Sequence, residues 1–343
     1  MEQLTFTGAS GKSEIFIGAD WRSAFDRTGP GQTIIITDNN VRSIYGPSFP
    51  DIPVISLEPG EASKRLDEIE RILVELLSLG ADRSTFLLGI GGGVVCDITG
   101  FVASIFMRGI SFGFVSTTLL SQVDASIGGK NGVNLSGTKN IVGTFAQPVF
   151  VICDQSMLDT LPGMEYISGL GEVVKHALIK DERMLGYLEE NVDAVISGDK
   201  DILENLIYRS VEIKAGIAGR DEKETGERRL LNFGHTVGHG IEAVTGLPHG
   251  IAVSHGMMIA SEFSYEDNMI DLNELGRIRS LLERLSLLPE ISPAKGAVSQ
   301  FLLKDKKRED QNIHFVFLEK PGRAAIKKVS LQDITGRLTL KNY

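Results

Sequence analysis

The segment Thr85–Asp97 is TFLLGIGGGVVCD, and it indicates the architecture of the first half of the chain. Thr85–Gly89 is a short apolar run that predicts a buried strand, and Gly91–Gly93 opens a helical segment. Glycines at such a junction let backbone amides approach a phosphate, and the N-terminus of the helix favours negative charge. Val94 replaces the last glycine of the usual dinucleotide-binding pattern, so the alternative interpretation is a tight strand-to-helix turn.

Asp97 adds information to this glycine loop. It lies one turn into a helix whose other residues are mostly apolar. A buried acid requires a polar partner, and a ribose or nicotinamide group would supply one. The loop and the acid together favour a nucleotide site.

The surrounding segments alternate in the same way. Thr33–Thr37, Phe112–Ser116 and Val149–Cys153 are strand-like, whereas Ala62–Leu79 has apolar residues at helical spacing. Strands that alternate with helices predict a parallel sheet covered by helices on both faces.

The pattern changes after about Pro162. The predicted helices are Met164–Lys180, Arg183–Ile196, Ile202–Arg220, Arg228–Thr245, Ile251–Asn268 and Asn273–Leu287. A strand-like pair, Ile313–Leu318 and Ala324–Val329, precedes the end. We therefore predict an α/β domain with a parallel sheet over residues 1–160, for nucleotide binding, and a mainly α-helical domain over residues 161–343, for metal and substrate.

Composition limits the class of protein. The 343 residues are 42% hydrophobic and 23% charged, which is ordinary for a globular enzyme, and the net charge of −10 disfavours a nucleic-acid partner. Cys96 and Cys153 are too few for a disulfide framework. The longest apolar stretch, Phe86–Met107, is interrupted by Asp97, so we expect no membrane span, and without a signal peptide we expect a cytoplasmic protein.

Histidines cluster in the second half. Four of the six lie between residues 235 and 255: His235, His239, His249 and His255. Glu172 is a carboxylate inside another largely apolar helix. Two imidazoles and a carboxylate form a recurring catalytic zinc set. A lone histidine of this kind is more often a hydrogen-bonded core residue, but four together favour metal, and spacing alone does not say which two bind it.

Basic residues in Gly-rich or apolar segments indicate an anionic ligand. Arg228, Asn232, His235 and His239 follow one another at spacings of four, three and four, which predicts one polar stripe on one helix. Cations beside a metal suggest a substrate with both a phosphate and a carboxylate. The cations are Arg108, Lys130, Lys139, Lys175, Lys214, Arg228 and the pair Lys306-Lys307.

With these residues identified, the sequence resembles the 3-dehydroquinate synthases. The segments that carry the resemblance run in order along nearly the whole chain: Gly91–Ile110, Thr117–Asn140, Gly169–Lys175 (GLGEVVK), Leu230–Glu242 (LLNFGHTVGHGIE), His249-Gly250 and Asp305–Lys307. The resemblance implies a nucleotide-binding α/β domain, a helical domain, an active site in the cleft and a homodimer.

The resemblance also implies a role for each matching residue. Zinc, with cobalt as an alternative, would bind to Glu172, His235 and His249. NAD would contact Asp38, Asn40, Glu61, Lys64, Gly92, Gly93, Asp97, Thr117, Thr118 and Thr160. The sugar phosphate substrate would contact Arg108, Asp124, Lys130, Lys139, Asn140, Lys175, Lys214, Arg228, Asn232, His239 and one or both of Lys306 and Lys307.

Two positions depart from the family pattern. Cys96 stands where the family usually has glycine, and Ile251 stands where it usually has glutamate after His-Gly. The missing carboxylate affects how His249 is oriented, and His255 is the alternative ligand.

The implied reaction converts 3-deoxy-D-arabino-heptulosonate 7-phosphate to 3-dehydroquinate, in the shikimate pathway, by transient oxidation, phosphate elimination, reduction and ring closure. Three alternatives remain. One is another sugar phosphate cyclase, or an aminated-substrate variant of the same reaction. The second is a metal-dependent alcohol dehydrogenase resembling glycerol dehydrogenase, although Gly100 holds the position of its usual lysine. The third is a non-catalytic binding protein.

Overall fold

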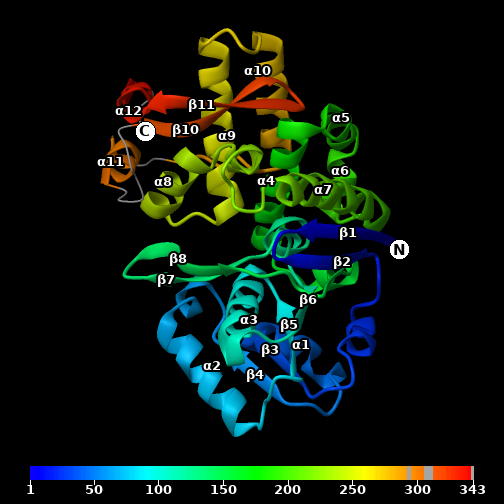
Figure 1. The fold of residues 1–343 in the computed structure, drawn as a ribbon. Coiled ribbons are helices and arrows are strands. Elements are labelled where there is room, and N and C mark those ends of the chain that lie inside the picture. The colour runs from blue at the N-terminus through cyan, green and yellow to red at the C-terminus, as the bar shows by residue number, and fades with distance from the viewer. Residues whose placement is uncertain (292–293, 295, 305–311, 341–343) are drawn as a thin grey trace. The chain divides into compact units, whose positions relative to one another are not determined.

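A computed structural model describes residues 1–291, 294, 296–304 and 312–340 of the chain (Figure 1). The chain forms two compact units. Unit 1 comprises Met1–Leu161 and Ile207–Lys223, and unit 2 comprises Pro162–Leu206 and Glu224–Tyr343. A single boundary near residue 160 does not describe this division, because helix α7 (Lys200–Arg220) carries the chain back into unit 1.

Unit 1 is built on a seven-stranded sheet with the order β1-β2-β9-β6-β5-β3-β4. All neighbouring pairs are parallel except β1 and β2, which form an antiparallel hairpin at one edge that the sequence patterns did not predict. The strands are β1 (Glu2–Gly8), β2 (Gly11–Ile17), β3 (Thr33–Asp38), β4 (Val54–Leu57), β5 (Phe86–Gly91), β6 (Phe112–Ser116) and β9 (Phe150–Cys153).

Helical segments cover both faces of this sheet. On one face, Trp21 of a 3-10 segment (Trp21–Arg27) packs with Ile35, Leu88 and Ile152 in a buried cluster. On the other face, α3 packs against β5 so closely that a Cβ at Gly89 would lie 2.9 Å from Thr99 Oγ1. The α-helices of unit 1, besides the part of α7, are α1 (Asn39–Tyr45), α2 (Leu66–Ser78) and α3 (Gly93–Ile105).

Short turns complete unit 1. The remaining 3-10 segments are Gly46–Ser48, Glu61–Ser63, Phe106–Arg108 and Gln155–Thr160, and Ser121–Ala125 is one π-helical turn. The predicted helix Ala62–Leu79 begins later, at Leu66, so Lys64 lies outside it.

A second hairpin lies beside α3 in unit 1 (Figure 1). Its strands are β7 (Lys130–Leu135) and β8 (Thr138–Phe145), where the sequence patterns predicted a polar loop. The two linking residues, Ser136 and Gly137, have φ values of 50° and 78°, which is typical of a tight hairpin turn. A Cβ at Gly100 would lie 1.9 Å from Asn131 Oδ1, so glycine allows α3 to approach β7.

Unit 2 is mainly helical, as predicted. Its helices are α4 (Gly163–Lys180), α5 (Glu182–Glu190), α6 (Val192–Ser197), α8 (His235–Thr245), α9 (His249–Glu266), α10 (Leu272–Arg284), α11 (Ala297–Lys304) and α12 (Leu331–Leu340). The predicted strand pair is confirmed as β10 (Asn312–Lys320) and β11 (Arg323–Ser330). No helix in the described ranges is both long and apolar enough to cross a bilayer.

The predicted helix Arg228–Thr245 is wrong. Glu227–Asn232 is a 3-10 segment, and α8 begins only at His235. Gly234 separates them with a φ of 78°, a left-handed conformation that interrupts a right-handed helix. Arg228 and Asn232 therefore do not share a helical face with His235 and His239.

Candidate active site

Glycines bring three elements of unit 2 together at their backbones. A Cβ at Gly250 of α9 would lie 1.8 Å from the Ser168 carbonyl oxygen of α4, and one at Gly171 of α4 would lie 2.5 Å from the Gly250 carbonyl oxygen. A Cβ at Gly234 would lie 2.7 Å from the Val253 carbonyl oxygen of α9. Each of these glycines is next in sequence to Glu172, His235 or His249. Close backbone packing thus determines where these three side chains meet.

Three side-chain atoms from these elements converge. Glu172 Oε1 lies 3.7 Å from His235 Nε2 and 3.8 Å from His249 Nε2. These separations are too long for hydrogen bonds. Ligands held at ~2.1 Å around a tetrahedral zinc ion would be about 3.4 Å apart, so the spacing is close to that of a metal-binding set.

Glu172 itself has the environment of a metal ligand. Its side chain is fully buried, and Oε2 forms an ion pair with Lys175 on the next turn of α4. Among the described residues, Oε1 accepts no hydrogen bond. A buried carboxylate oxygen without a donor is costly, and a cation between it and the two imidazoles would remove that cost.

Both imidazoles present Nε2 to this carboxylate because their other nitrogens face acceptors. His235 Nδ1 lies 3.2 Å from the Phe233 carbonyl oxygen, and His249 Nδ1 lies 3.1 Å from Glu242 Oε2. The proton of each neutral ring therefore belongs on Nδ1, which leaves the Nε2 lone pair for a metal ion.

Electrostatics distinguish the two rings. Burial, with the positive charge of Lys175, lowers the pKa of His235 well below its usual value. Burial also lowers the pKa of His249, but the hydrogen bond with Glu242 and the charges of Glu172 and Glu242 outweigh it, so the net pKa is raised. His235 is thus neutral and ready to bind metal at neutral pH.

The other two clustered histidines occupy different environments. His239 is exposed, and the centroid of its ring lies 5.3 Å from that of His235 and 5.7 Å from that of His249. His235, His239 and His249 therefore form an alternative metal-binding group. His255 lies farther along α9, is buried, and is not part of that group.

The remaining predicted substrate residues of unit 2 lie on the 3-10 segment before α8. Arg228 is buried there, and the Asn232 side-chain amide donates a hydrogen bond to Glu224. Lys306 and Lys307 fall outside the described residues.

In unit 1, the glycine loop adjoins two predicted cofactor residues. Gly92 is the N-cap of α3, and a Cβ there would lie 2.9 Å from Thr118 Cγ2. The backbone amide of Thr117 donates to the Gly91 carbonyl oxygen at 3.0 Å. Gly93 begins α3, so the helix N-terminus and the loop after β6 form a small cradle suited to a phosphate.

A polar network lies next to this cradle. The ammonium of Lys64, whose side chain is 4% exposed, donates to Asp97 Oδ2 and to Asn140 Oδ1, both at 2.6 Å. Burial raises the pKa of Asp97, although the charge of Lys64 opposes this effect. Asn134 links the hairpin to the network, since its amide donates to Glu61 Oε1 at 2.8 Å and its oxygen accepts from the Asn140 backbone amide at 2.8 Å.

Asp38, Asn40 and Thr160, also predicted to contact the cofactor, lie at the ends of elements. Asp38 ends β3 and caps α1, with Oδ1 accepting from the backbone amides of Asn40 and Val41 at 2.9 and 3.0 Å. Thr160 Oγ1 lies 2.7 Å from the Tyr45 hydroxyl. The capping role of Asp38 therefore uses Oδ1.

The predicted anion-binding residues of unit 1 fall into two groups. Lys214 of α7 is buried, and its ammonium lies 2.6 Å from Asp124 Oδ1 in the π-helical turn. Arg108, Lys130 and Lys139 are exposed. Arg108 has a φ of 70° in the turn after α3, a left-handed conformation that costs free energy in any residue but glycine.

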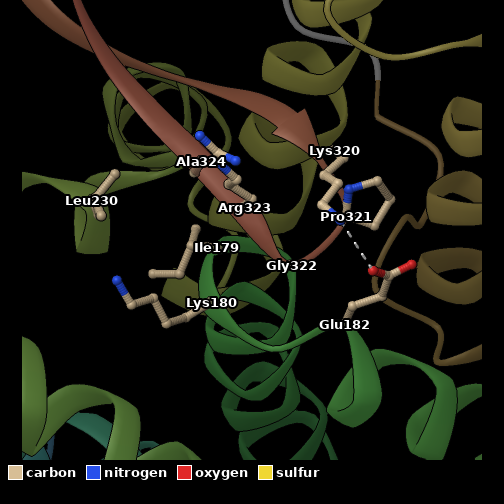
Figure 2. Close-up of a pocket in the computed structure, with 9 residues that line it drawn as sticks. All are labelled: Ile179, Lys180, Glu182, Leu230, Lys320, Pro321, Gly322, Arg323 and Ala324. Atoms are coloured by element: carbon tan, nitrogen blue, oxygen red, sulfur yellow. Dashed lines mark ion pairs between the residues drawn. The ribbon is translucent and has the colours of Figure 1, made fainter.

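A surface pocket of unit 2, at the turn between β10 and β11, contains none of the predicted site residues (Figure 2). Its three cations already have carboxylate partners: Lys180 pairs with Glu227 at 2.8 Å, Lys320 with Glu182 at 3.8 Å and Arg323 with Glu319 at 2.5 Å. The pocket therefore gives no support for a second anion site.

Among the polar residues that contact predicted site residues, Glu242, Asn134 and Glu224 were not predicted from the sequence. Glu242 and Asn134 lie within segments that carry the family resemblance, but neither has a spacing that indicates a role. Their partners come from other elements, so only the tertiary contacts identify them.

Family models cover most of the chain. The description "3-dehydroquinate synthase N-terminal" matches residues 54–168, and "3-dehydroquinate synthase C-terminal" matches residues 169–308. The 3-dehydroquinate synthase of Acidithiobacillus ferrooxidans is 42% identical over 310 residues, which are 86% of this chain and 85% of that protein.

Two of the solved structures that share this fold are synthases with bound NAD⁺ and a divalent metal. A 2-epi-5-epi-valiolone synthase from Streptomyces hygroscopicus, with NAD⁺ and Zn²⁺ bound, has a TM-score of 0.87 and 25% identity, covering 99% of this chain and 97% of its own. A 2-deoxy-scyllo-inosose synthase complexed with carbaglucose-6-phosphate, NAD⁺ and Co²⁺ has a TM-score of 0.88 and 24% identity, covering 99% and 100%. The likeness to the second shows a shared fold.

Proposed function

Because the chain belongs to the 3-dehydroquinate synthase family, its activity is the synthesis of 3-dehydroquinate, and we propose that it acts as an NAD- and metal-dependent lyase. The substrate of this activity is 3-deoxy-D-arabino-heptulosonate 7-phosphate, and the second product is phosphate. The reaction belongs to the shikimate pathway of aromatic biosynthesis. The family assignment argues against the two alternatives of an alcohol dehydrogenase and a non-catalytic binding protein.

One observation carries the metal part of the proposal. Glu172 Oε1 is buried without a hydrogen-bond donor among the described residues, and it faces His235 Nε2 and His249 Nε2 at 3.7 and 3.8 Å. These three atoms would hold a zinc ion, or cobalt in its place. The bound Zn²⁺ or Co²⁺ of the cyclase relatives supports this assignment.

The cofactor part rests on unit 1. The cradle at Gly92, Gly93 and Thr118 would hold the pyrophosphate of NAD, and Asp97 and Lys64 would contact its ribose and nicotinamide. When bound, the metal would supply a Lewis acid for the substrate hydroxyl at the site of oxidation, and NAD would supply a reversible hydride acceptor.

The chain's own residues bind and orient the substrate. Arg108, Lys130 and Asn140 would hold the phosphate, whereas Lys214, Arg228 and a lysine of the 306–307 pair would hold the carboxylate or nearby hydroxyls. His239 and Asn232 would move and hold protons at the reacting hydroxyls. The substrate's own phosphate can accept the proton lost in the elimination, so positioning matters more than a strong protein base. We expect the enzyme to be a cytoplasmic homodimer.

Phosphate release tests the proposal. The protein is incubated with 3-deoxy-D-arabino-heptulosonate 7-phosphate with and without NAD, after chelation, and again after zinc is restored. We expect release, with 3-dehydroquinate as product, only when NAD and metal are both present. Glu172→Gln should abolish zinc binding and turnover, and Glu182→Gln, a change at a half-exposed carboxylate paired with Lys320, should leave both unchanged.

Release that persists without metal or NAD would overturn the cofactor assignment. If NAD and zinc bind but no phosphate is released, the substrate assignment is wrong. Glucose 6-phosphate and sedoheptulose 7-phosphate, the substrates expected of other sugar phosphate cyclases, are then tested.

A further inference from the structure

His249 lies between two carboxylates, and each faces a different ring nitrogen. Glu242 Oε2 is 3.1 Å from Nδ1, which is a hydrogen-bond distance, whereas Glu172 Oε1 is 3.8 Å from Nε2, which is not. A neutral imidazole carries one proton, and the Glu242 contact places it on Nδ1. Glu242 thereby selects the tautomer and the ring orientation in which Nε2 points toward Glu172.

Glu242 reaches His249 from a different helix. It lies near the C-terminal end of α8, the helix that begins with His235, and its side chain is 17% exposed. Helix α8 packs closely on α9, since a Cβ at Gly238 would lie 2.8 Å from Val253 Cα. One helix thus supplies a metal-facing imidazole at its start and an acceptor for the second imidazole near its end.

The residue at position 251 cannot take this role. The family resemblance leads us to expect a glutamate there, but Ile251 has no polar side-chain atom and is 1% exposed within α9. His235, by contrast, is oriented by the backbone carbonyl of Phe233 at 3.2 Å. The orientation of His249 therefore depends on a side chain, and the orientation of His235 does not.

We propose that Glu242 is the positioning residue that orients His249 as a metal ligand. The inference rests on the proposed metal site at Glu172, His235 and His249. Partners of this kind fix the ring and increase its basicity, and their loss weakens metal binding by roughly 10- to 100-fold.

The experiment compares metal binding in full-length Glu242→Gln and Glu242→Ala. Affinity for Zn²⁺ is measured by competition with a chromophoric chelator, and the visible absorption of bound Co²⁺ reports the ligand geometry. We expect affinity to fall roughly 10- to 100-fold in Glu242→Ala and less in Glu242→Gln, because glutamine retains a neutral acceptor oxygen. The Co²⁺ spectrum should change in both variants at saturating metal.

Two controls separate the possible results. Glu262→Gln changes another carboxylate of unit 2, on α9 and paired with Arg279 at 2.7 Å, and it should keep wild-type affinity and spectrum. Melting temperatures of the metal-free proteins show whether a variant is merely less stable. Because glutamine nearly matches glutamate in volume, Glu242→Gln remains informative if Glu242→Ala does not fold.

Each unfavourable result has a distinct meaning. If Glu172→Gln loses Co²⁺ but both Glu242 variants keep the wild-type affinity and spectrum, the positioning role is wrong and the metal site stands. A lower melting temperature with an unchanged Co²⁺ spectrum assigns Glu242 a structural role only, which also overturns the inference. If Glu172→Gln binds Co²⁺ normally, the proposed metal site itself fails.

Discussion

Replacing Gly250 with alanine should disturb the stability of unit 2 and the metal site together. The added Cβ would lie 1.8 Å from the Ser168 carbonyl oxygen and 2.7 Å from its carbonyl carbon. Real Cβ atoms essentially never approach closer than 3.0 Å, so the backbones of α4 and α9 must separate by at least 1.2 Å, the difference between 3.0 and 1.8 Å. The obstacle is backbone, which no side-chain rotation can move away.

The expected cost follows from two effects. Overpacking of a core contact costs about 1–3 kcal/mol. The separation also breaks the 3.0 Å hydrogen bond from the Gly250 amide to Ser168 Oγ, which contributes about 0.5–1.5 kcal/mol. Together they lower the stability by about 1.5–4.5 kcal/mol. This corresponds to a fall in melting temperature of roughly 3–18 °C for a unit of this size.

The metal site should be lost at the same time. His249 is next to Gly250, and metal-ligand distances tolerate deviations of only about 0.2 Å. A shift of 1.2 Å or more would therefore carry His249 Nε2 out of reach of an ion held by Glu172 and His235. Calorimetry of the metal-free protein measures the stability, and chelator competition measures the affinity for Zn²⁺.

Gly186→Ala is the matched control. Gly186 lies within α5, and a Cβ there would have no neighbour within 4 Å. Alanine in a helix is more stable than glycine by about 0.5–1 kcal/mol, so this variant should melt slightly higher and bind Zn²⁺ normally. If Gly250→Ala melts and binds Zn²⁺ like the wild type, the reasoning from backbone contact is refuted.

Three further changes test other parts of the molecule. Lys175→Met leaves the fully buried Glu172 carboxylate without its ion partner, so urea unfolding of the metal-free protein should show a free energy of unfolding lower by about 3–5 kcal/mol. Bound Zn²⁺ should reduce this loss of stability, and an equal loss with and without metal would contradict the prediction. Gly92→Ala places a Cβ in the cradle, 2.9 Å from Thr118 Cγ2. Calorimetric titration should show NAD binding weakened roughly tenfold, about 1.4 kcal/mol. Gly276→Ala, whose added Cβ has no neighbour within 4 Å, should leave NAD binding unchanged. Burial lowers the pKa of His255 in the folded protein below 6.5, the usual pKa of histidine. Below pH 6.5 the unfolded chain therefore binds more protons than the folded protein, and the free energy of unfolding falls as the pH drops toward the folded-state pKa. His255→Leu should reduce this acid-side slope by up to about 1.4 kcal/mol per pH unit, and an unchanged slope in urea unfolding between pH 7 and 5 would rule out the contribution.

Local patterns were sufficient to predict much of the fold. The strand-glycine-helix junction at Thr85–Asp97, several helices of the second half and the strand pair near the end all depend on apolar periodicity and on glycine placement within short segments. The residue types at the site were also predictable, because a buried acid and clustered histidines are rare without a polar ligand.

Other features depend on single dihedral angles and on contacts between distant segments. The expected continuous helix Arg228–Thr245 is interrupted because Gly234 adopts a φ of 78°, which periodicity does not reveal. The strands of the β7–β8 hairpin are polar and Gly-rich, a pattern that predicts a loop, and the positive φ of the turn at Ser136 and Gly137 is not evident from that pattern.

The sequence by itself indicated the family, the two kinds of unit and the candidate residues for binding metal, cofactor and anions. Only the tertiary structure decided which atoms of unit 2 converge, because Glu172, His235 and His249 meet through glycine contacts between α4, α8 and α9. It also decided that Glu242 faces His249 Nδ1 at a hydrogen-bond distance. A hydrogen bond depends on the distance between donor and acceptor in the folded chain. The spacing of the two residues along the sequence does not determine this distance.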